Sequence, residues 1–314
     1  MRRPRPGRHA ARGRPRALLV GCGDIGLRVA ALLKPRYALL GTVRRGERAA
    51  ALRAAGIRPI VADLDDRRTL RRLAGIAQVI LHFAPPPDTG EKDMRTRHLL
   101  AAVARGAAPA RLVYISTSGV YGDCGGARIS ETRPVRPQSA RAARRADAEA
   151  QLRAWAGRNA VCASILRVPG IYAADRLPLE RLRAGAPAVI AAEDTYTNHI
   201  HADDLARIVV AAMRRGRPNR VYHACDDGEM KMGDYLDAVA DAFELPRPQR
   251  MPRRKVLEAV SPALRSFMSE SRRLSNERMK RELTVALSYP TVQEGLGATR
   301  VAQSAAHRRP RSPL

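Results

Sequence analysis

The chain has 314 residues, which is enough for one large domain or for a main domain with a smaller appendage. Its 57 Lys and Arg residues outnumber its 30 Asp and Glu residues, so the formal net charge is +27. Arg interrupts every hydrophobic stretch before it reaches the roughly 20 residues that a bilayer requires, and the sequence therefore excludes a membrane-spanning helix.

The positive charge comes mainly from Arg, with 52 Arg against five Lys, and it is spread through the chain. Such charge attracts nucleic-acid phosphates, but no recognised nucleic-acid motif accompanies it. We interpret it as a compositional bias and expect no specific nucleic-acid partner. The cysteines form no C-x-x-C pair, which favours a cytoplasmic protein without a metal site or disulfides. They are Cys22, Cys124, Cys162 and Cys225.

The chain begins with a basic stretch over residues 1–16, which carries seven Arg and no carboxylate. It lacks the apolar core of a secretory signal, so we expect a disordered tail there rather than an export signal.

Short apolar runs, each bounded by turn residues and followed by a helical pattern, begin after this tail. They are RALLVG (16–21), YALLGTV (37–43), IRPIVADL (57–64), AQVILHFA (77–84) and RLVYISTS (111–118). This alternation predicts βαβ units and an α/β fold of the Rossmann type, a doubly wound parallel sheet covered on both faces. In the first helix we expect Ile25, Val29 and Leu32 to form the apolar stripe.

A glycine motif, G-x-G-x-x-G, joins the first strand to the first helix at Gly21, Gly23 and Gly26. Glycine permits the tight turn and lets a pyrophosphate approach the N–H groups of the helix N-terminus. The motif predicts a dinucleotide site whose loop also contains Asp24 and Ile25, with Asp24 as a first-turn carboxylate that favours the helix dipole. We interpret Cys22 as a small filler whose pKa the helix N-terminus would lower.

The second strand ends in GTVRR, which places Arg44 and Arg45 about 20 residues after the glycines. An NAD site usually has Asp or Glu there to bind the ribose 2′-hydroxyl. A carboxylate would repel a 2′-phosphate, whereas Arg binds it bidentately. We therefore expect NADP as the cofactor in preference to NAD.

VADLDD, HFA and YISTSGVYG, which follow the third, fourth and fifth strands, resemble the extended short-chain dehydrogenase/reductase superfamily of nucleotide-sugar epimerases and dehydratases. ILRVPGIYAADR, NHIHADDLARIV and the C-terminal LSNERMKRELTVALSYPTVQEGL extend the resemblance over about residues 17–297, the last being similar to an atypical epimerase-like subgroup. The resemblance assigns roles to Asp63 and Leu64, which hold the adenine ring, and to His82, Phe83 and Ala84, which line the cofactor. It makes Thr117 the catalytic Ser/Thr, which we also expect to contact the cofactor.

One departure from that superfamily lies in PQSARAARRADAEAQL (137–152), which reads as an Arg-rich amphipathic helix. The family pattern P-x-x-x-Y-x-x-x-K-x-x-x-E keeps Pro137 and Glu149, but Arg141 stands at the Tyr position and Arg145 at the Lys position. A guanidinium does not exchange its proton near neutrality, so the standard proton relay is absent. Arg145 can still hold a ribose hydroxyl or a phosphate, and we expect cofactor binding to survive.

Other polar residues are weaker candidates for acid–base chemistry. We interpret Tyr121, Tyr172, His199 and His201 as packed residues rather than catalytic groups. Asp203 and Asp204 are expected to cap the helix that follows them.

Beyond residue 170 the alternation loosens, with predicted helices at 177–185, 202–215 and 232–244 and a short strand at 220–225. We divide the chain into the tail 1–16, an NAD(P)-binding core over 17–170, a mixed substrate-binding region over 171–297 that returns elements to the core, and a disordered tail over 298–314.

Two functions fit the sequence. The first is an NADP-dependent oxidoreductase or epimerase-like enzyme with an atypical active site at Thr117, Arg141 and Arg145. Its substrate would be a small molecule, anionic or nucleotide-linked, and the protein a monomer or homodimer. The alternative is a non-catalytic NADP-binding sensor or regulatory protein.

Overall fold

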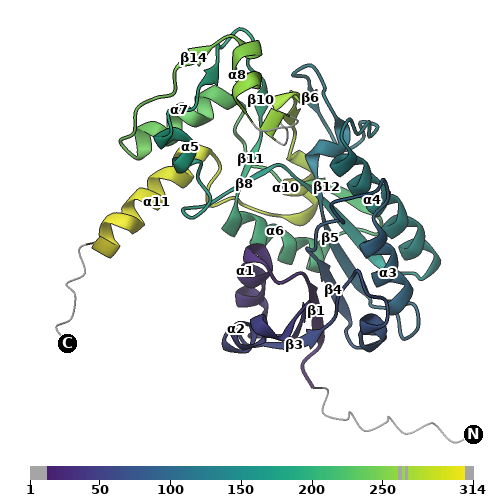
Figure 1. Cartoon of the computed structure of the whole chain (residues 1–314). Helices are drawn as coiled ribbons and strands as arrows, with labels where there is room; N and C mark the ends of the chain where they lie inside the picture. The colour runs from purple at the N-terminus through teal and green to yellow at the C-terminus, as the bar shows by residue number, and fades with distance from the viewer. Residues whose placement is uncertain (1–12, 261–263, 266–267, 308–314) are drawn as a thin grey trace, which may run out of the picture.

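A central sheet with helices on both sides, and a smaller region above its carboxyl end, make up the fold (Figure 1). The computed structural model describes residues 13–260, 264–265 and 268–307. Most of the expected tail over 1–16 lies outside the described residues. The strands of the main sheet are β1 (Arg16–Val20), β2 (Ala38–Val43), β3 (Ile57–Val61), β4 (Val79–His82), β5 (Arg111–Thr117), β7 (Cys162–Val168) and β12 (Arg220–His223).

The seven strands are parallel and lie in the order β12-β7-β5-β4-β1-β2-β3, which confirms the predicted doubly wound sheet. From β1 the chain moves outward to β3, then returns to β4 on the other side of β1. The strand order therefore reverses between β1 and β4. In open α/β sheets this switch point opens a crevice at the carboxyl ends of the strands, where ligands bind.

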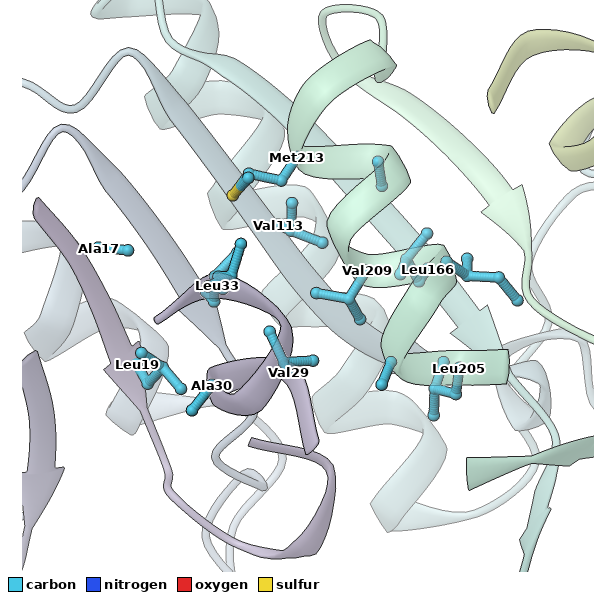
Figure 2. Close-up of a cluster of buried hydrophobic side chains, with 14 of the residues drawn as sticks. Ala17, Leu19, Val29, Ala30, Leu33, Val113, Leu166, Leu205, Val209 and Met213 are labelled. Atoms are coloured by element: carbon cyan, nitrogen blue, oxygen red, sulfur yellow. The ribbon is translucent and has the colours of Figure 1, made fainter. Parts of the chain in front are cut away.

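Helices cover both faces of this sheet. Successive side chains of a strand point to opposite faces, and here both sets are apolar, so each face needs a cover. The helices that carry the core are α1 (Asp24–Leu33), α3 (Met94–Val103), α4 (Ala140–Arg158) and α6 (Ala202–Arg215). Ala17 and Leu19 of β1 belong to one cluster with Val29 of α1 and with Leu205 and Val209 of α6, and both helices cover this face of the sheet (Figure 2). Leu18 and Val20 belong to the opposite cluster, which includes residues of α3 and α4.

Two local expectations differ from the structure. Leu32 is 45% exposed, because α1 turns Gly26, Val29, Ala30 and Leu33 toward the core instead. The crossover after β3 contains no α-helix within the described residues. It is the 3₁₀ helix η2 (Thr69–Leu73), which fills its short span with Leu70 and Leu73.

The smaller region is built from short strands and helices that pack on the carboxyl end of the sheet. Its strands are β6 (Arg128–Ile129), β8 (Gly170–Tyr172), β9 (Ala188–Val189), β10 (Tyr196–Thr197), β11 (His199–His201), β13 (Met230–Lys231), β14 (Arg250–Met251) and β15 (Arg273–Leu274). Its helices are α5 (Leu179–Arg183), α7 (Met232–Ala242), α8 (Arg253–Ala259) and α11 (Val292–His307). The helix α10 (Glu277–Leu283) returns to the main core, where it packs on α6 and β12. The other short helices among the described residues are η1 (Gly46–Arg48), α2 (Ala49–Ala54) and η3 (Ser118–Tyr121).

The prediction of a disordered C-terminal tail over 298–314 was wrong for its first ten residues, 298–307. α11 continues through His307, and residues 308–314 lie outside the described residues. Val292 and Leu296 are buried in a cluster with Tyr172 and Leu236, so packing on the smaller region holds the start of this helix.

The capping of α6 also differs from the expectation. The N-cap is His201, whose Nδ1 accepts a hydrogen bond from the Asp203 backbone N–H at 3.2 Å. Asp203 and Asp204 lie in the first turn, and each binds elsewhere. Asp203 accepts from Arg28, while the buried Asp204 accepts the backbone N–H groups of Ser288 and Tyr289.

Candidate active site

The glycine loop packs against the backbone that follows β4. Gly21 has φ +91°, and a Cβ there would lie 2.7 Å from the Ala84 backbone nitrogen. A Cβ at Gly26 would lie 2.9 Å from the Gly21 carbonyl oxygen, so both positions require glycine. Gly23, at the N-cap of α1, has no atom within 4 Å of a Cβ position. The loop therefore leaves the N-terminus of α1 open to an anionic ligand.

A cleft of about 740 Å³ opens in front of this loop at the switch point of the sheet. It brings together most of the residues that the sequence predicted for the cofactor. They are Gly21, Gly23, Asp24, Ile25, Gly26, Arg44, Arg45, Asp63, Leu64, Phe83, Ala84 and Arg145. A dinucleotide laid across it would place its pyrophosphate at the glycine loop.

His82 and Thr117 are the predicted cofactor residues that do not line the cleft, and Thr117 lines the second cavity described below. The side chain of His82 is fully buried behind the wall, where Nε2 lies 3.0 Å from Thr96 Oγ1. Burial, aided by the charge of Arg145, lowers the pKa of His82 to about 3. The imidazole is therefore neutral, and it packs against the ring of Tyr114 with centroids 5.1 Å apart instead of lining the cofactor.

At the β2 end of the cleft, Arg44 and Arg45 are joined by Arg48 from η1. Two carboxylates, Glu47 and Asp63, line the same end. Three guanidiniums against two carboxylates still give this end a positive balance. Sequence reasoning missed Arg48, although the motif RRGER carried the signal.

Several further cleft residues come from distant segments and gave no local signal in the sequence. Arg95 lines the cleft from α3 and binds Asp65 through two hydrogen bonds of 2.8 and 2.7 Å. Arg176 reaches it from the loop after β8, with Nε 3.7 Å from Asp24 Oδ2. The other lining residues outside the prediction are Cys22, Thr42, Val43, Leu52, Ala62, Pro85, Ile115 and Ile171.

Cys22 differs from the expectation in its ionisation. Burial raises the pKa of its thiol to about 11, and this outweighs the lowering effect of Arg48 and of the backbone hydrogen bond from Thr42. The thiol is thus a packed filler, as its size indicated, and not an activated nucleophile.

A second cavity, of about 310 Å³, adjoins the far end of the cleft. The two share Pro85, Ile115, Arg145 and Ile171 in their linings, so they form one continuous site. The residues found only in the second cavity are Pro86, Pro87, Asp88, Ser116, Thr117, Arg141, Arg144, Val168 and Pro169. The structure therefore places Thr117, Arg141 and Arg145 around one cavity.

Thr117 ends β5 and caps the 3₁₀ helix η3, where its hydroxyl accepts a hydrogen bond from the Gly119 N–H at 3.2 Å. Arg145 is held against the sheet, donating to Tyr114 OH at 3.0 Å and to the Ile115 carbonyl at 2.7 Å. Its guanidinium also lies 5.6 Å from the centre of the Tyr114 ring. The cavity thus presents a fixed hydroxyl and a fixed cation beside the cofactor cleft.

Beneath the cavity lies a buried polar network that the sequence did not predict. Glu149 accepts hydrogen bonds from Ser116 at 2.6 Å and from Arg167 at 2.7 and 3.1 Å. Arg167 also donates to Tyr121 OH at 2.6 Å, and that hydroxyl lies 2.6 Å from His223 Nε2. Burial raises the pKa of Tyr121 to about 12. The network fixes the floor of the cavity, and Tyr121 is engaged within it.

The other weak candidates lie in the packed interior, outside the linings of both cavities. Tyr172 donates its hydroxyl to the Thr291 carbonyl at 3.2 Å and lies edge-on to His201. His199 stacks on Tyr235 with ring centroids 4.1 Å apart, and burial lowers its pKa to about 3.

No helix among the described residues has both the length and the apolar content needed to cross a membrane. The four cysteines are all free.

Comparison with known proteins places residues 18–225 on the model of the NAD dependent epimerase/dehydratase family. A dTDP-glucose 4,6-dehydratase of Mycobacterium tuberculosis is 29% identical over 195 residues, which are 55% of this chain and 58% of that protein, so the match spans less than two thirds of the relative. A 4-hydroxy-2-methyl-3-oxo-4-farnesyl-3,4-dihydroquinoline-1-oxide ketoreductase of Stigmatella aurantiaca is 26% identical over 318 residues, covering 90% of this chain and 94% of the relative.

Among solved structures, a conserved protein of unknown function from Silicibacter pomeroyi is 30% identical with a TM-score of 0.79. The superposition covers 92% of this chain and 99% of that one. The likeness therefore extends through the smaller region as well as the main sheet.

Proposed function

The chain belongs to the NAD dependent epimerase/dehydratase family, and we propose that it is an NADP-dependent oxidoreductase or epimerase-like enzyme with an atypical active site. The observation that carries this proposal is the continuous site that runs from Arg44 and Arg45, past the glycine loop, to Thr117 and Arg145. The four free and scattered cysteines favour a cytoplasmic setting.

The orientation of the cofactor follows from the order of groups along the cleft. The ribose of the adenosine half lies at the end of β2 in this fold, and the pyrophosphate at the glycine loop. The nicotinamide half then extends toward Ile115 and Arg145, where the second cavity opens. The substrate would occupy that cavity, within reach of the reactive end of the cofactor.

The bound cofactor supplies or accepts a hydride, and the residues of the cavity handle the oxygen of the reacting carbon. Thr117 can hold that oxygen through its hydroxyl. Arg145, fixed by Tyr114 and Ile115, can stabilise negative charge on it without giving up a proton. Electrostatic stabilisation would thus replace part of the function of the Tyr phenol and the Lys ammonium, whose positions Arg141 and Arg145 occupy.

The cofactor preference gives the first test. Arg44 and Arg45 favour the 2′-phosphate of NADP, so unmodified protein should bind NADPH more tightly than NADH. A charged hydrogen bond contributes about 1.5–3 kcal/mol, which corresponds to roughly tenfold to a hundredfold in affinity. Fluorescence titration with both cofactors measures the ratio.

Replacing Arg44 and Arg45 together by Ala should erase that preference while leaving NADH binding nearly unchanged. Arg36, an exposed basic residue beyond α1, serves as the matched control when changed to Ala. Equal affinities for NADPH and NADH in the unmodified protein would refute the NADP assignment, and the proposal would then revert to NAD.

The substrate class is proposed from the two curated relatives and from the cavity. One relative is a dTDP-glucose 4,6-dehydratase, which favours a nucleotide-linked sugar, while the other is a ketoreductase. Both reactions use a hydride and a carbonyl. A screen distinguishes them if it follows NADPH oxidation by ketones and, with NADP⁺ bound, the formation of product from nucleotide-sugars, because a dehydration or an epimerisation leaves the cofactor with no net change.

A second candidate function rests on Arg141 and Arg145, since both stand where the family pattern has its proton-transfer pair. A cofactor-binding sensor needs no such pair. Tight NADPH binding with neither cofactor oxidation nor product formation from any compound in the screen supports the sensor, whereas turnover supports the enzyme.

A further inference from the structure

Three arginines of α4 converge on the second cavity. Arg141, Arg144 and Arg145 are spaced i, i+3 and i+4, which places them on one face of the helix. All three line the same cavity. Like charges at this spacing are unfavourable in a helix, and here they are directed into a cavity rather than toward open solvent.

Arg144 and Arg141 are withdrawn from solvent and lie close to other positive charges. Arg144 is only 7% exposed and donates Nη1 to the Gly90 carbonyl at 2.7 Å, while its buried Nε has no hydrogen-bond partner among the described residues. Burial lowers the pKa of Arg141, and the nearby charges of Arg145, Arg272 and Arg144 act in the same direction against Glu270. The cluster is therefore held at an electrostatic cost.

Three acidic side chains lie near these arginines, and the two buried ones each form an ion pair with another arginine. Glu270 is buried beside η3 and forms an ion pair with Arg272 at 2.8 Å. Asp88 is exposed, and it is the one carboxylate among the described residues that line the cavity. Glu149, below the floor, is occupied by Arg167.

We propose that this cavity is an anion subsite, in which Arg141, Arg144 and Arg145 bind a carboxylate or phosphate carried by the substrate. The proposal rests on the proposed function, because the cavity meets the nicotinamide end of the cofactor cleft through Ile115 and Arg145. The substrate is then a ketone or alcohol whose reacting carbon lies close to an oxyanion. Guanidinium groups suit this ligand because their planar donors match two oxygens of a carboxylate or phosphate.

Binding of small oxyanions to the NADP⁺-saturated protein tests this subsite. Saturation fills the phosphate positions of the cleft, so added inorganic phosphate reports on the remaining site. Isothermal titration calorimetry at constant ionic strength, set with sodium chloride, compares inorganic phosphate with acetate, a carboxylate that has no alcohol for NADP⁺ to oxidise. Whichever binds more tightly identifies the oxyanion, and we expect at least one to bind specifically.

The decisive variant is Arg141→Gln, since Arg141 lines only the second cavity. It should weaken binding of the preferred anion at least tenfold, whereas Arg153→Gln, on the exposed side of the same helix, should change it less than twofold. Arg141→Lys keeps the charge but loses the planar donors, and should lie between them. NADPH titration of each variant shows that it is folded.

Unchanged anion binding in Arg141→Gln, or equal losses in Arg141→Gln and Arg153→Gln, would overturn the subsite. Failure of the proposed function is distinguishable, because it appears as loss of NADPH binding in the unmodified protein. Normal NADPH binding combined with no specific anion binding would refute this inference alone.

Discussion

At the scale of single residues, the family pattern over 137–149 contains both a structural position, which Glu149 keeps, and the proton-transfer positions, which Arg141 and Arg145 occupy. Glu149 keeps its place in the family pattern, and the structure shows a reason for this: its carboxylate is held by Arg167 and Ser116 under the cavity. The sequence revealed the position of Glu149 but not its partner. Glu149 lies on α4, whereas Arg167 lies on β7, within an apolar stretch of sequence that gave no sign of a buried ion pair.

The Arg167–Glu149 pair should matter strongly for stability. Both side chains are 5% exposed, so Arg167→Met would leave a buried carboxylate without its counter-ion. Breaking such a pair costs about 3–5 kcal/mol in the free energy of unfolding. Urea denaturation followed by circular dichroism measures the loss.

The exposed pair Arg183–Glu180 provides the control, because its side chains are 55% and 90% exposed. Arg183→Met should change the free energy of unfolding by less than about 0.5 kcal/mol. The double variant Arg167→Met, Glu149→Leu should recover part of the loss, since no charge then remains buried. Similar losses in Arg167→Met and Arg183→Met would contradict a buried pair.

At the scale of elements, strands were easier to predict than the segments between them. A buried parallel strand is a short apolar run, and β1, β2, β4 and β5 all lie within the predicted runs. The helices depend more on their partners. Leu32 fits the helical spacing of an apolar stripe in the sequence. The direction in which α1 meets the sheet exposes Leu32, however, and buries Leu33 instead.

The helix α11 was missed for a related reason. Its sequence contains two glycines and few large apolar residues, so its periodicity is weak. Gly295 is nevertheless required, because a Cβ there would lie 2.6 Å from Tyr172 Cε2 and 2.9 Å from Cζ. The fit is visible only when α11 and Tyr172 are seen together.

Two glycines of α11 form a matched pair for a packing test. Gly295→Ala should destabilise the protein by about 1–3 kcal/mol, because the new methyl group meets the buried ring of Tyr172. Gly297→Ala meets nothing within 4 Å and should be neutral or stabilise by up to about 1 kcal/mol, since Ala favours a helix. Thermal unfolding compares them, and equal effects would mean that α11 does not pack on Tyr172.

At the scale of the whole molecule, the excess of arginine is used in part to satisfy backbone carbonyls. Arg144 binds the Gly90 carbonyl, Arg145 that of Ile115, and Arg272 that of Gly122, each within 2.8 Å. These bonds join segments that are far apart in sequence. They support the interpretation of the charge as a property of the whole chain rather than of one nucleic-acid surface.

The candidate site shows the same division between local and distant information. The glycine loop and the residues after β2, β3 and β4 were predictable, because each lies at the carboxyl end of a strand, and parallel strands bring those ends together. Arg95 and Arg176 were not, because Arg95 reaches the cleft from helix α3 and Arg176 from the loop after β8, far from the glycine loop in the sequence.

Buried titratable groups should give the folded protein a stability maximum near pH 6.5. Burial lowers the pKa of His82, His199 and His223 from 6.5 to about 3, with nearby Arg charges adding to the effect for His82 and His223. Below pH 6.5 the unfolded chain binds protons on these residues that the folded chain does not, so stability falls as the pH falls. Asp226 acts in the opposite direction, because burial raises its pKa from 3.8 to about 8.

The net slope follows from counting these protons. Each proton of difference changes the free energy of unfolding by about 1.4 kcal/mol per pH unit. Between pH 4 and 6.5 three of these histidines oppose one aspartate, so these four groups contribute a loss of about 3 kcal/mol per unit of acidification. Burial also lowers the pKa of His201, which adds to the loss, and raises that of Asp194, which opposes it.

Above pH 6.5 only Asp226 among these four groups remains to titrate, and stability should decline gently up to pH 8. Urea denaturation from pH 5 to pH 8 measures both limbs. Asp226→Asn should remove the alkaline decline and leave the acid limb in place, because the side chain is 3% exposed and its Oδ2 accepts no hydrogen bond within the described residues. An alkaline decline that persists unchanged in Asp226→Asn would show that Asp226 is already ionised in the folded protein at neutral pH.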